Sequence, residues 1–313
     1  MSRIIFVPQY PTPMRYQEWW TGKFTEEFEK AGLEVIVIGE KHADMMKHRR
    51  GRMSMFSPIN AAIEFECAQI DEYMDLELKD DDVLFMSDIS FPGVFGSVLF
   101  HKRPKRCFAF CHATSLNHLD YFEKDKRAKF PIESSHAALM DVVFVGSNYH
   151  EDKLGWSNTI VTRLPYPPLK TLHINWKEKW YDIISASRPT PQKVDLELEK
   201  LVSKKFSQVN RPISDSWEDY YRVLAYSKIL LITAQEETFG YQVIDAVLNG
   251  CIPIAPNKFS YPELIPRNYL YDSPEELLDI IEAVLGGMRG VPVILCTQEI
   301  ERFYHNIIQI MKG

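Results

Sequence analysis

Two carboxylates, Glu237 and Asp245, stand eight residues apart with Gly240 between them. A carboxylate accepts hydrogen bonds from neighbouring hydroxyl groups, such as those of a ribose or a hexose. Gly240 lets the backbone approach a ligand closely, just before an expected helix whose N-terminus suits an anion. The simpler alternatives are solvent-facing helix charges and an ordinary loop glycine. If the stretch is functional, it is suited to hold a sugar nucleotide.

Two cations, Arg188 and Lys193, lie five residues apart in the segment Arg-Pro-Thr-Pro-Gln-Lys. Arginine suits bidentate contact with a phosphate, and lysine acts as a compact point charge. The prolines stiffen the loop, so that little entropy is lost when a ligand binds. Taken alone, the segment is better explained as a solvated surface loop; as part of a site, it predicts a diphosphate ligand.

The elements around these residues place them at the edge of a sheet. The apolar run 228–233 predicts a buried strand, the stretch after Gly240 predicts a helix that ends at Asn249-Gly250, and 251–255 predicts the next strand. Arg188 and Lys193 follow the strand expected at 182–186. Because ligands of such units bind outside the carboxyl ends of the strands, we expect the site there.

The same alternation of strands and helices runs along the chain and predicts an α/β fold with parallel sheets. Further strands are expected at 3–7, 34–38, 83–86, 107–111 and 142–145. Helices are expected at 23–30, 60–74, 196–206, 217–226, 275–285 and 298–311, with a short turn of helix after Pro262 and a polar loop at 207–216. The 313 residues suffice for about two domains, and the prolines of 165–168 mark the boundary.

Four elements of the second half resemble the retaining GT-B glycosyltransferases, especially glycosyltransferase family 4. The family's Arg-x4-Lys element corresponds to Arg188 and Lys193, and its Glu-x7-Glu element, whose loop is Glu-x-Phe-Gly, corresponds to Glu237 through Asp245. The segment 246–255 is similar to its Ala-x3-Gly-x-Pro-Val segment, and 262–264 is similar to its Pro-Glu-Leu turn. The resemblance covers 188–264 and extends loosely over the chain.

The resemblance implies the fold and the domains. The expected class is α/β with the GT-B fold, in which two Rossmann-like domains face each other across a cleft. Residues 1–166 would form the acceptor-side domain and 167–297 the domain that binds the nucleotide sugar. The final helix, 298–313, would pack back on the first domain.

The resemblance also implies roles for individual residues. Arg188 and Lys193 would hold the donor diphosphate and offset the charge on the leaving nucleotide, and Glu237 would contact hydroxyls of the transferred sugar. The loop residues Thr238, Phe239 and Gly240 would present backbone N–H groups to the sugar and phosphate, and Asp245 would hold the nucleotide ribose.

The sequence departs from the family's pattern at three places. Asp245 is one methylene shorter than the usual Glu, so its reach to the ribose is reduced. The segment between Lys193 and Trp217 is short, and the strand with a Gly-rich turn that helps to seat the base is expected to be absent. The Gly-Gly turn after the first strand is replaced by Pro8-Gln-Tyr-Pro.

In the first half, several residues follow expected strands. His112 resembles the family histidine that contacts the donor sugar, although a buried structural histidine is an equal alternative. Asp88 is a candidate to touch an acceptor hydroxyl, with a structural role as the simpler alternative. Trp19 and Trp20 could stack on a sugar or base, but an adjacent pair is as often half core. Ser147 and Tyr149 resemble the family's residues near the cleft.

The mechanism follows from the resemblance. Retaining enzymes of this fold use neither a metal nor a protein nucleophile, and the donor's own phosphate is thought to assist the incoming hydroxyl on the same face. We therefore expect no metal site and no cofactor, with a UDP-sugar as the donor substrate. The protein would orient both substrates and stabilise the departing diphosphate. The acidic run 79–82 precedes a strand and is better explained as a solvated turn.

The acceptor side carries two cationic runs, 47–52 with Arg49, Arg50 and Arg52, and 101–106. In a chain of net charge −7 they favour an anionic acceptor, with solvated surface charge as the alternative. Candidates are hydroxymethylated DNA of viral modification systems, phosphorylated sugars, anionic polysaccharide and lipid headgroups.

Two other functions compete with glycosyl transfer: a sugar-nucleotide epimerase of GT-B fold, and an inactive GT-B scaffold that binds nucleic acid or carbohydrate. The first residues enter a strand directly, and no apolar run reaches the ~20 residues of a membrane span. The five cysteines form no Cys-x-x-Cys pair and are expected to be reduced core thiols. We expect a cytoplasmic protein, or one of the host cytoplasm if viral.

Overall fold

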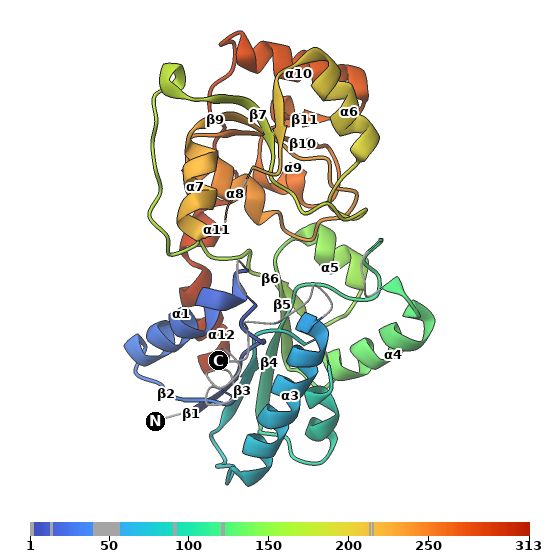
Figure 1. Ribbon diagram of the computed structural model, residues 1–313. Coiled ribbons are helices and arrows are strands. Elements are labelled where there is room, and N and C mark those ends of the chain that lie inside the picture. The colour runs from blue at the N-terminus through green and yellow to red at the C-terminus, as the bar shows by residue number, and fades with distance from the viewer. Residues whose placement is uncertain are drawn as a thin grey trace.

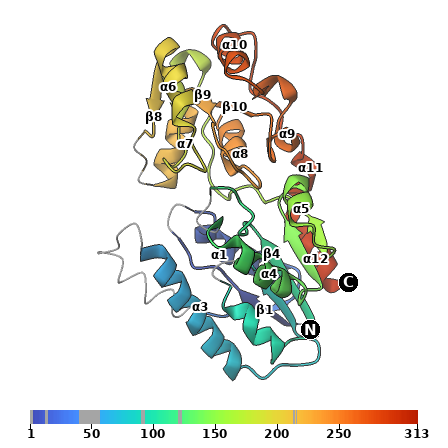
Figure 2. The same cartoon turned by 90° about the vertical axis from the view of Figure 1, so that its right-hand side faces the viewer.

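The computed structural model describes residues 3–12, 15–39, 57–89, 93–119, 123–212, 214 and 216–313. It contains two parallel β-sheets, one in each half of the chain, with helices on both faces of each (Figure 1). In Figure 1 the first half lies below and the second half above; Figure 2 shows the same stacking from the side.

The first sheet has six strands in the order β2-β1-β3-β4-β5-β6. They are β1 (Arg3–Val7), β2 (Glu34–Val37), β3 (Val83–Met86), β4 (Arg106–Cys111), β5 (Val142–Val145) and β6 (Thr159–Val161). β1 pairs with β2 on one side and with β3 on the other, so the direction of winding reverses at β1. In open parallel sheets, a ligand site lies at the carboxyl ends of the strands at such a reversal.

Alternate side chains of β1 face opposite layers. Ile4 and Phe6 pack in one hydrophobic cluster, with Phe24 of α1 (Gln17–Lys30) and Phe303 of α12 (Phe303–Lys312). Ile5 and Val7 pack in another, with side chains of α3 (Ser57–Asp75) and α4 (Lys126–Ala137). The sheet is thus covered on both faces, which explains why its strands are apolar runs without alternation (Figure 1).

The second sheet has five strands in the order β11-β10-β9-β7-β8. They are β7 (Tyr181–Ser185), β8 (Gln208–Asn210), β9 (Ser227–Leu231), β10 (Ile252–Pro256) and β11 (Leu270–Tyr271). Its helices are α6 (Leu196–Lys205), α7 (Trp217–Ala225), α8 (Tyr241–Leu248), α9 (Tyr261–Leu264) and α10 (Pro274–Leu285). The winding reverses between β7 and β9, so the carboxyl ends of these two strands mark this sheet's ligand position.

The chain ends on the first sheet's side. After α11 (Thr297–Glu301) and a break at Arg302, α12 packs against α1, with the ring of Phe303 5.7 Å from that of Phe24. The chain's C-terminus therefore lies beside the first sheet in both views (Figures 1 and 2).

Most expected elements are present, but the prediction of a loop at 207–216 was wrong at its start. Gln208–Asn210 forms the edge strand β8, paired with β7. Four α-helices or β-strands were not predicted: α4, α5 (Asn148–Leu154), β6 and β11. The short β6 has too few residues for a period, and α4 contains Pro131, which looks like a helix breaker. The final helix is divided into α11 and α12 at Arg302.

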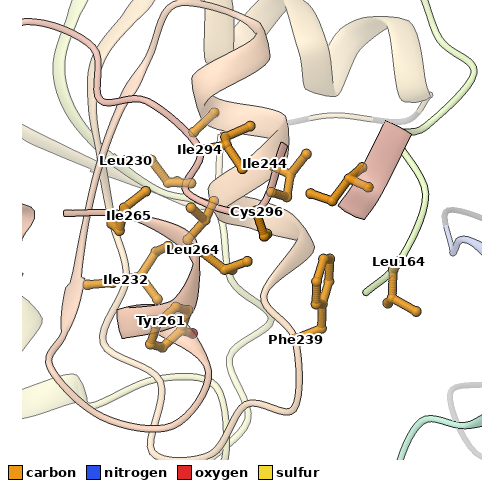
Figure 3. Close-up of a cluster of buried hydrophobic side chains, with 14 of the residues drawn as sticks. Leu164, Leu230, Ile232, Phe239, Ile244, Tyr261, Leu264, Ile265, Ile294 and Cys296 are labelled. Carbon is orange, nitrogen blue, oxygen red and sulfur yellow. The ribbon is translucent and has the colours of Figure 1, made fainter. Parts of the chain in front are cut away.

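The core of the second half joins β9, β10 and the helices around them (Figure 3). Leu230, Ile244, Leu264 and Ile294 meet there with Cys296, all less than 10% exposed. All five cysteines are free, as expected; four are buried, whereas Cys67 is exposed and not in the core. In the part of the chain that the structure describes, no helix is long and apolar enough to cross a membrane.

Candidate active site between the two sheets

The loop after β9 reaches the position where the second sheet reverses its winding. It carries Glu236 and Glu237 and leads into α8. The loop after β7 lies beside it: the Gln235 amide donates to the Gln192 carbonyl at 2.8 Å, and the Asp195 amide donates to the Thr233 carbonyl at 3.2 Å. The two motifs that the sequence places 44 residues apart therefore form one surface at the carboxyl edge of the sheet.

Lys193 and Glu237 are in direct contact in this surface. The Lys193 ammonium lies 2.9 Å from Glu237 Oε2, and both side chains are about one-fifth exposed. Burial opposes ionisation of the Glu237 carboxyl, but the Lys193 charge and the backbone amides of Thr238 and Phe239 hold its pKa below the usual value. Glu237 is thus an ionised acceptor for hydroxyl groups, next to a cation that suits a phosphate.

Arg188 lies at the exposed start of the same loop. The Thr190 amide donates to the Arg188 carbonyl at 2.7 Å, and the Lys193 amide donates to the Thr190 carbonyl at 2.9 Å. These two turns fold the six residues into a compact loop. Arg188 and Lys193 therefore stand at the two ends of one compact loop at the end of β7, and their role in binding a diphosphate stays a prediction.

Gly240 begins α8 in a conformation that favours glycine, with φ of 99°. A methyl group there would lie 3.1 Å from Leu264 Cδ1 and 3.1 Å from Tyr261 Cε1, so both the backbone and the space call for glycine. The preceding Phe239 is 3% exposed and packs in the core cluster of Figure 3. Its side chain anchors the loop, and only its backbone is left to serve a ligand.

The first half of the chain meets this loop directly. Thr238 Oγ1 donates to the His112 carbonyl at 2.9 Å, and Ser147 Oγ donates to the Thr238 carbonyl. His112 follows β4 and Ser147 follows β5, so the carboxyl edges of the two sheets face each other. Thr238 of the second half is thus brought together with His112 and Ser147 of the first.

The His112 side chain is neutral and held in one orientation. Burial lowers its pKa to about 3. Its Nε2 lies 3.0 Å from the Ser87 carbonyl oxygen and therefore carries the proton, leaving Nδ1 as an acceptor. The rings of Tyr16 and Trp20 lie 4.7 and 4.8 Å from the imidazole. A ring of this kind can position a ligand, but it does not titrate near pH 7.

Tyr16 was not anticipated from the sequence. It precedes α1 and is half-buried, and burial together with the charge of Asp88 raises the pKa of its phenol well above the usual value. The charge of Glu237 also acts on this phenol. Its ring lies 4.7 Å from that of His112 in the first half and 5.8 Å from that of Tyr241 in the second, so Tyr16 stands where the two halves meet. No local pattern distinguishes it from any other tyrosine after a proline-rich loop.

Asp88 lies where the first sheet reverses its winding, at the carboxyl end of β3. Gln9, at the end of β1, donates its side-chain amide to Asp88 Oδ2, and the Gln9 backbone amide donates to Ser87 Oγ at 2.7 Å. Asp88 is 8% exposed. Asp88 thus lies next to Ser87, whose carbonyl is 3.0 Å from His112 Nε2, and its acceptor-side role stays a prediction.

The two adjacent tryptophans have different surroundings. Trp20 is 2% exposed and packs between Phe24 and Phe110, so no face of its ring is available to an acceptor. Trp19 is half-buried, with its ring centroid 6.3 Å from that of Tyr241 in the second half. Of the pair, only Trp19 keeps a position from which it can contact a ligand.

Asp245 is not close to the sugar side of the loop. Its carboxyl is 4% exposed and accepts a hydrogen bond from Tyr221 Oη at 2.9 Å, inside the contact between α7 and α8. Burial raises its pKa to about 7. The shorter side chain has turned to a neighbouring helix, so the structure does not bring Asp245 together with Lys193 and Glu237, and its ribose role lacks support in this arrangement.

Comparison with known proteins points to one fold. No family model matches the sequence. The lipopolysaccharide outer core galactosyltransferase, in its apo form, superposes with a TM-score of 0.66 at 13% identity, covering 99% of this chain and 98% of that one. The sucrose-phosphate synthase of Thermosynechococcus elongatus gives 0.61 at 13% identity, with 91% and 90% covered. The trehalose-6-phosphate protein of E. coli, bound with UDP-2-fluoro glucose, gives 0.59 at 11% identity, with 99% and 95% covered.

This chain has the GT-B fold.

The GT-B fold predicted from the sequence is therefore confirmed. A sequence relative adds a local similarity: the tRNA-queuosine alpha-mannosyltransferase of Drosophila melanogaster is 37% identical over 89 residues. The match covers 28% of this chain and 22% of that protein, so the chain spans about a fifth of this relative's length.

Two further carboxylates join the halves of this GT-B chain, and sequence reasoning missed both contacts. Glu236 accepts from Tyr149 Oη at 2.9 Å and from Lys153 Nζ at 2.6 Å. Glu263, in the Pro-Glu-Leu turn, accepts the amides of Asn148 and Tyr149 at 2.9 Å each, at the N-terminus of α5. Such contacts, formed between distant segments, leave no periodic pattern in the sequence.

Of the two cationic runs, only 101–106 lies among the residues that the structure describes. Arg49, Arg50 and Arg52 lie outside the residues that the structure describes. In the run 101–106, Lys102 donates to the carbonyls of Met74 and Leu76 at the end of α3, and Arg103 pairs with Asp141. This run leads into β4, at the edge of the sheet opposite to His112, and the charges of Lys102 and Arg103 serve the fold. It therefore lends no support to an anionic acceptor.

Metal ligands are a separate question. Among the described residues, no group of three or more His, Cys, Asp or Glu side chains could hold a metal ion. The metal-independent mechanism stays a prediction.

Proposed function

We propose that the protein is a retaining glycosyltransferase that moves a sugar from a nucleoside diphosphate sugar, a UDP-sugar in the first instance, to a hydroxyl acceptor. The observation that carries the proposal is the Lys193–Glu237 pair, 2.9 Å apart, at the winding reversal of the second sheet and at the entrance to α8. A cation for phosphate and an ionised acceptor for sugar hydroxyls thus stand side by side. The UDP-2-fluoro glucose of the E. coli neighbour supports the choice of UDP.

In this mechanism Lys193 and Arg188 hold the diphosphate, Glu237 orients the sugar, and the backbone of 238–240 approaches both. The acceptor hydroxyl attacks the anomeric carbon on the face from which the diphosphate departs. The bond between that carbon and the phosphate oxygen breaks, and the hydroxyl proton passes to the leaving phosphate. The two cations offset the charge that develops on the diphosphate, so the step needs no metal.

For the acceptor we propose a hydroxyl of a modified nucleoside in tRNA, in the cytoplasm. The local similarity to a tRNA-queuosine mannosyltransferase supports a nucleoside, and it also supports mannose as a sugar to test. An RNA would be the anionic acceptor that the run containing Arg49, Arg50 and Arg52 suggests. Hydroxymethylated DNA is the second acceptor to test.

The first test is nucleotide binding by the purified chain. Thermal shift with UDP, GDP and their sugars should show stabilisation by one nucleotide. Lys193→Ala should lower the affinity for that nucleotide about 10- to 100-fold, because a charged hydrogen bond to phosphate is lost. Lys200→Ala, in a salt bridge whose side chains are 65% and 83% exposed, is the control and should bind as wild type. If no nucleotide stabilises the protein, the function is refuted.

The second test is transfer. The bound donor is incubated with tRNA or with hydroxymethylated DNA, and nucleosides are analysed by mass after digestion. A mass increase of one hexose on a tRNA nucleoside is the expected result. An isomerised donor without any acceptor product would instead identify an epimerase, and binding without turnover would identify a scaffold.

A further inference from the structure

A small cavity lies at the winding reversal of the first sheet, between the ends of β1 and β3 and helix α3. It has a volume of about 10 Å³. Its polar lining comprises Gln9, Tyr10, Glu66, Gln69 and Asp88, and the rest of its lining is apolar. This position is equivalent to that of the Lys193–Glu237 pair in the second sheet. Of its lining, the sequence analysis names only Asp88 as a candidate, and the proposed chemistry uses none of it.

Three polar atoms in this lining are buried without a partner. By hydrogen-bond geometry, no described residue pairs with Glu66 Oε2, Gln9 Oε1 or Tyr10 Oη, although the nearby backbone amides of Gly93 and Val94 also favour the ionised Glu66 carboxyl. The three side chains are at most 9% exposed. Buried oxygen atoms without donors are rare in folded proteins and mark places where a water, an ion or a ligand belongs.

The orientations of these groups are fixed by their other contacts. Glu66 Oε1 accepts the backbone amide of Phe95, which leaves Oε2 as the unpaired oxygen. Gln9 donates its side-chain NH₂ to Asp88, so its carbonyl oxygen is the atom left over. Both unpaired atoms, Glu66 Oε2 and Gln9 Oε1, are acceptors when Glu66 is ionised. When Glu66 is ionised, the missing partner is therefore a donor.

The charge and the size of the cavity limit which chemical groups can occupy it. The described residues that line the cavity include two carboxyls, Glu66 and Asp88, and no Lys, Arg or His. A phosphate or carboxylate would meet like charge there and find no counter-ion among these described residues. The volume admits a single water-sized group. An ammonium group fits both conditions, since it donates up to three hydrogen bonds and carries the opposite charge.

The cavity lies beside the candidate active site. Asp88 lines it, and the carbonyl of the adjacent Ser87 lies 3.0 Å from His112 Nε2, while the His112 carbonyl accepts from Thr238 Oγ1 at 2.9 Å. A molecule anchored in the cavity would therefore lie next to His112 and the donor-side loop. This is the side on which an acceptor must lie.

We propose that this cavity binds a protonated amine of the acceptor, with Glu66 as the charged partner and the Gln9 oxygen as a second acceptor. Binding of an amine in the cavity does not depend on the proposed function. Only the assignment of that amine to the acceptor rests on it. Burial raises the pKa of Glu66 to about 7, so the carboxyl is poised between its two forms, and an ammonium would favour the ionised one. The amine fixes where the acceptor lies, and its hydroxyl then reaches the donor.

The test compares three probes of equal size and different charge: serinol (an amine with two hydroxyls), glycerol and glycerate. Binding to the full chain is followed at pH 7 by saturation-transfer NMR titration, without nucleotide. Serinol should bind about tenfold more tightly than glycerol, and glycerate should bind most weakly. Glu66→Gln should remove this preference for serinol.

Glu133→Gln is the matched control, because Glu133 is also a buried carboxyl but accepts hydrogen bonds from Ser115 and does not line the cavity. It should retain the wild-type preference. If the Glu66→Gln variant does not fold, Tyr10→Phe is used in its place and should lower the affinity for serinol about threefold. Equal binding of the three probes, no binding of any, or an equal loss in Glu133→Gln would overturn the proposal and leave a cavity that holds only water.

The nucleotide thermal shift is measured on the same samples. If no nucleotide binds but serinol binds through Glu66, glycosyl transfer fails and the amine site stands. If a nucleotide binds and sugar is transferred while serinol does not bind, the amine site alone fails.

Discussion

Lys153 Nζ lies 2.6 Å from Glu236 Oε2, joining helix α5 of the first domain to the loop after β9 in the second. The two side chains are 16% and 3% exposed. Because removal of the cation leaves a buried carboxylate without its counter-ion, Lys153→Met should lower the free energy of unfolding by about 2–3 kcal/mol, measured by urea denaturation.

The exposed pair Lys200–Glu197 provides the comparison, with side chains 65% and 83% exposed. Lys200→Met should change the stability by no more than about 0.5 kcal/mol. A double-mutant cycle with Glu236→Gln should assign at least about 1 kcal/mol of coupling to the Lys153 contact. Equal effects of Lys153→Met and Lys200→Met would mean that the interdomain pair contributes no more than a surface one.

Gly240→Ala should destabilise the protein by about 2 kcal/mol, since φ of 99° is unfavourable for alanine and the methyl group would lie 3.1 Å from Leu264 Cδ1. Thermal unfolding measures the change. Gly22, inside α1 with no atom within 4 Å of an added methyl, should respond in the opposite sense: Gly22→Ala should stabilise by about 0.5–1 kcal/mol. A stable Gly240→Ala variant would contradict the strained entrance to α8.

The sequence was sufficient to predict those parts of the site that depend on local order. Strand ends and helix starts are recognisable from apolar runs and from glycine, so the sequence alone places Arg188, Lys193 and Glu237 at one sheet edge, where the fold has them. The contact between Lys193 and Glu237 needs only that β7 and β9 be neighbours, which the alternation of elements makes expected.

The contacts between domains could not be predicted in the same way. Glu236 and Lys153 are 83 residues apart, and nothing in either segment distinguishes them from solvated charges. Trp19 and Trp20 are equivalent in the sequence, but the helix phase of α1 buries one against Phe24 and leaves the other half-exposed. The family motif assigned Asp245 to the nucleotide ribose, yet its carboxyl instead accepts a hydrogen bond from Tyr221 Oη.

The burial of His150 in its neutral form should make the protein less stable in acid. It is 1% exposed, both ring nitrogens lack a hydrogen-bond partner among the described residues, and burial lowers its pKa to about 3. An unfolded histidine takes up a proton near pH 6.5 while the folded one does not. The stabilisation is therefore complete above pH 6.5 and falls with pH, by about 2 kcal/mol between pH 7 and 5.

His150→Leu tests this account, because an apolar side chain leaves no buried nitrogen unpaired. Urea unfolding at pH 5, 6 and 7 should show a variant whose stability falls less steeply in acid by about 2 kcal/mol over that range. An unchanged acid slope would mean that His150 is protonated in the folded protein.

The buried Asp245 carboxyl should give stability the opposite pH dependence, and the variant Asp245→Asn tests this. Its pKa is raised to about 7 by burial, so the folded carboxyl keeps a proton that the unfolded one releases near pH 4. Its contribution to stability is complete below the unfolded value and is lost as the pH rises toward 7. Asp245→Asn cannot ionise, so its stability relative to wild type should increase by about 2–3 kcal/mol between pH 5 and 8.

The same variant separates packing from ribose binding. Because Asp245 accepts the Tyr221 hydroxyl inside the α7–α8 contact, the Asn side chain can keep that bond, and the affinity for UDP should stay within about threefold of wild type. Lys193→Ala, measured beside it by calorimetry, should lose at least about tenfold. A tenfold loss of UDP affinity in Asp245→Asn would instead return the carboxylate to the ribose, and would require α8 to turn Asp245 toward the donor when nucleotide binds.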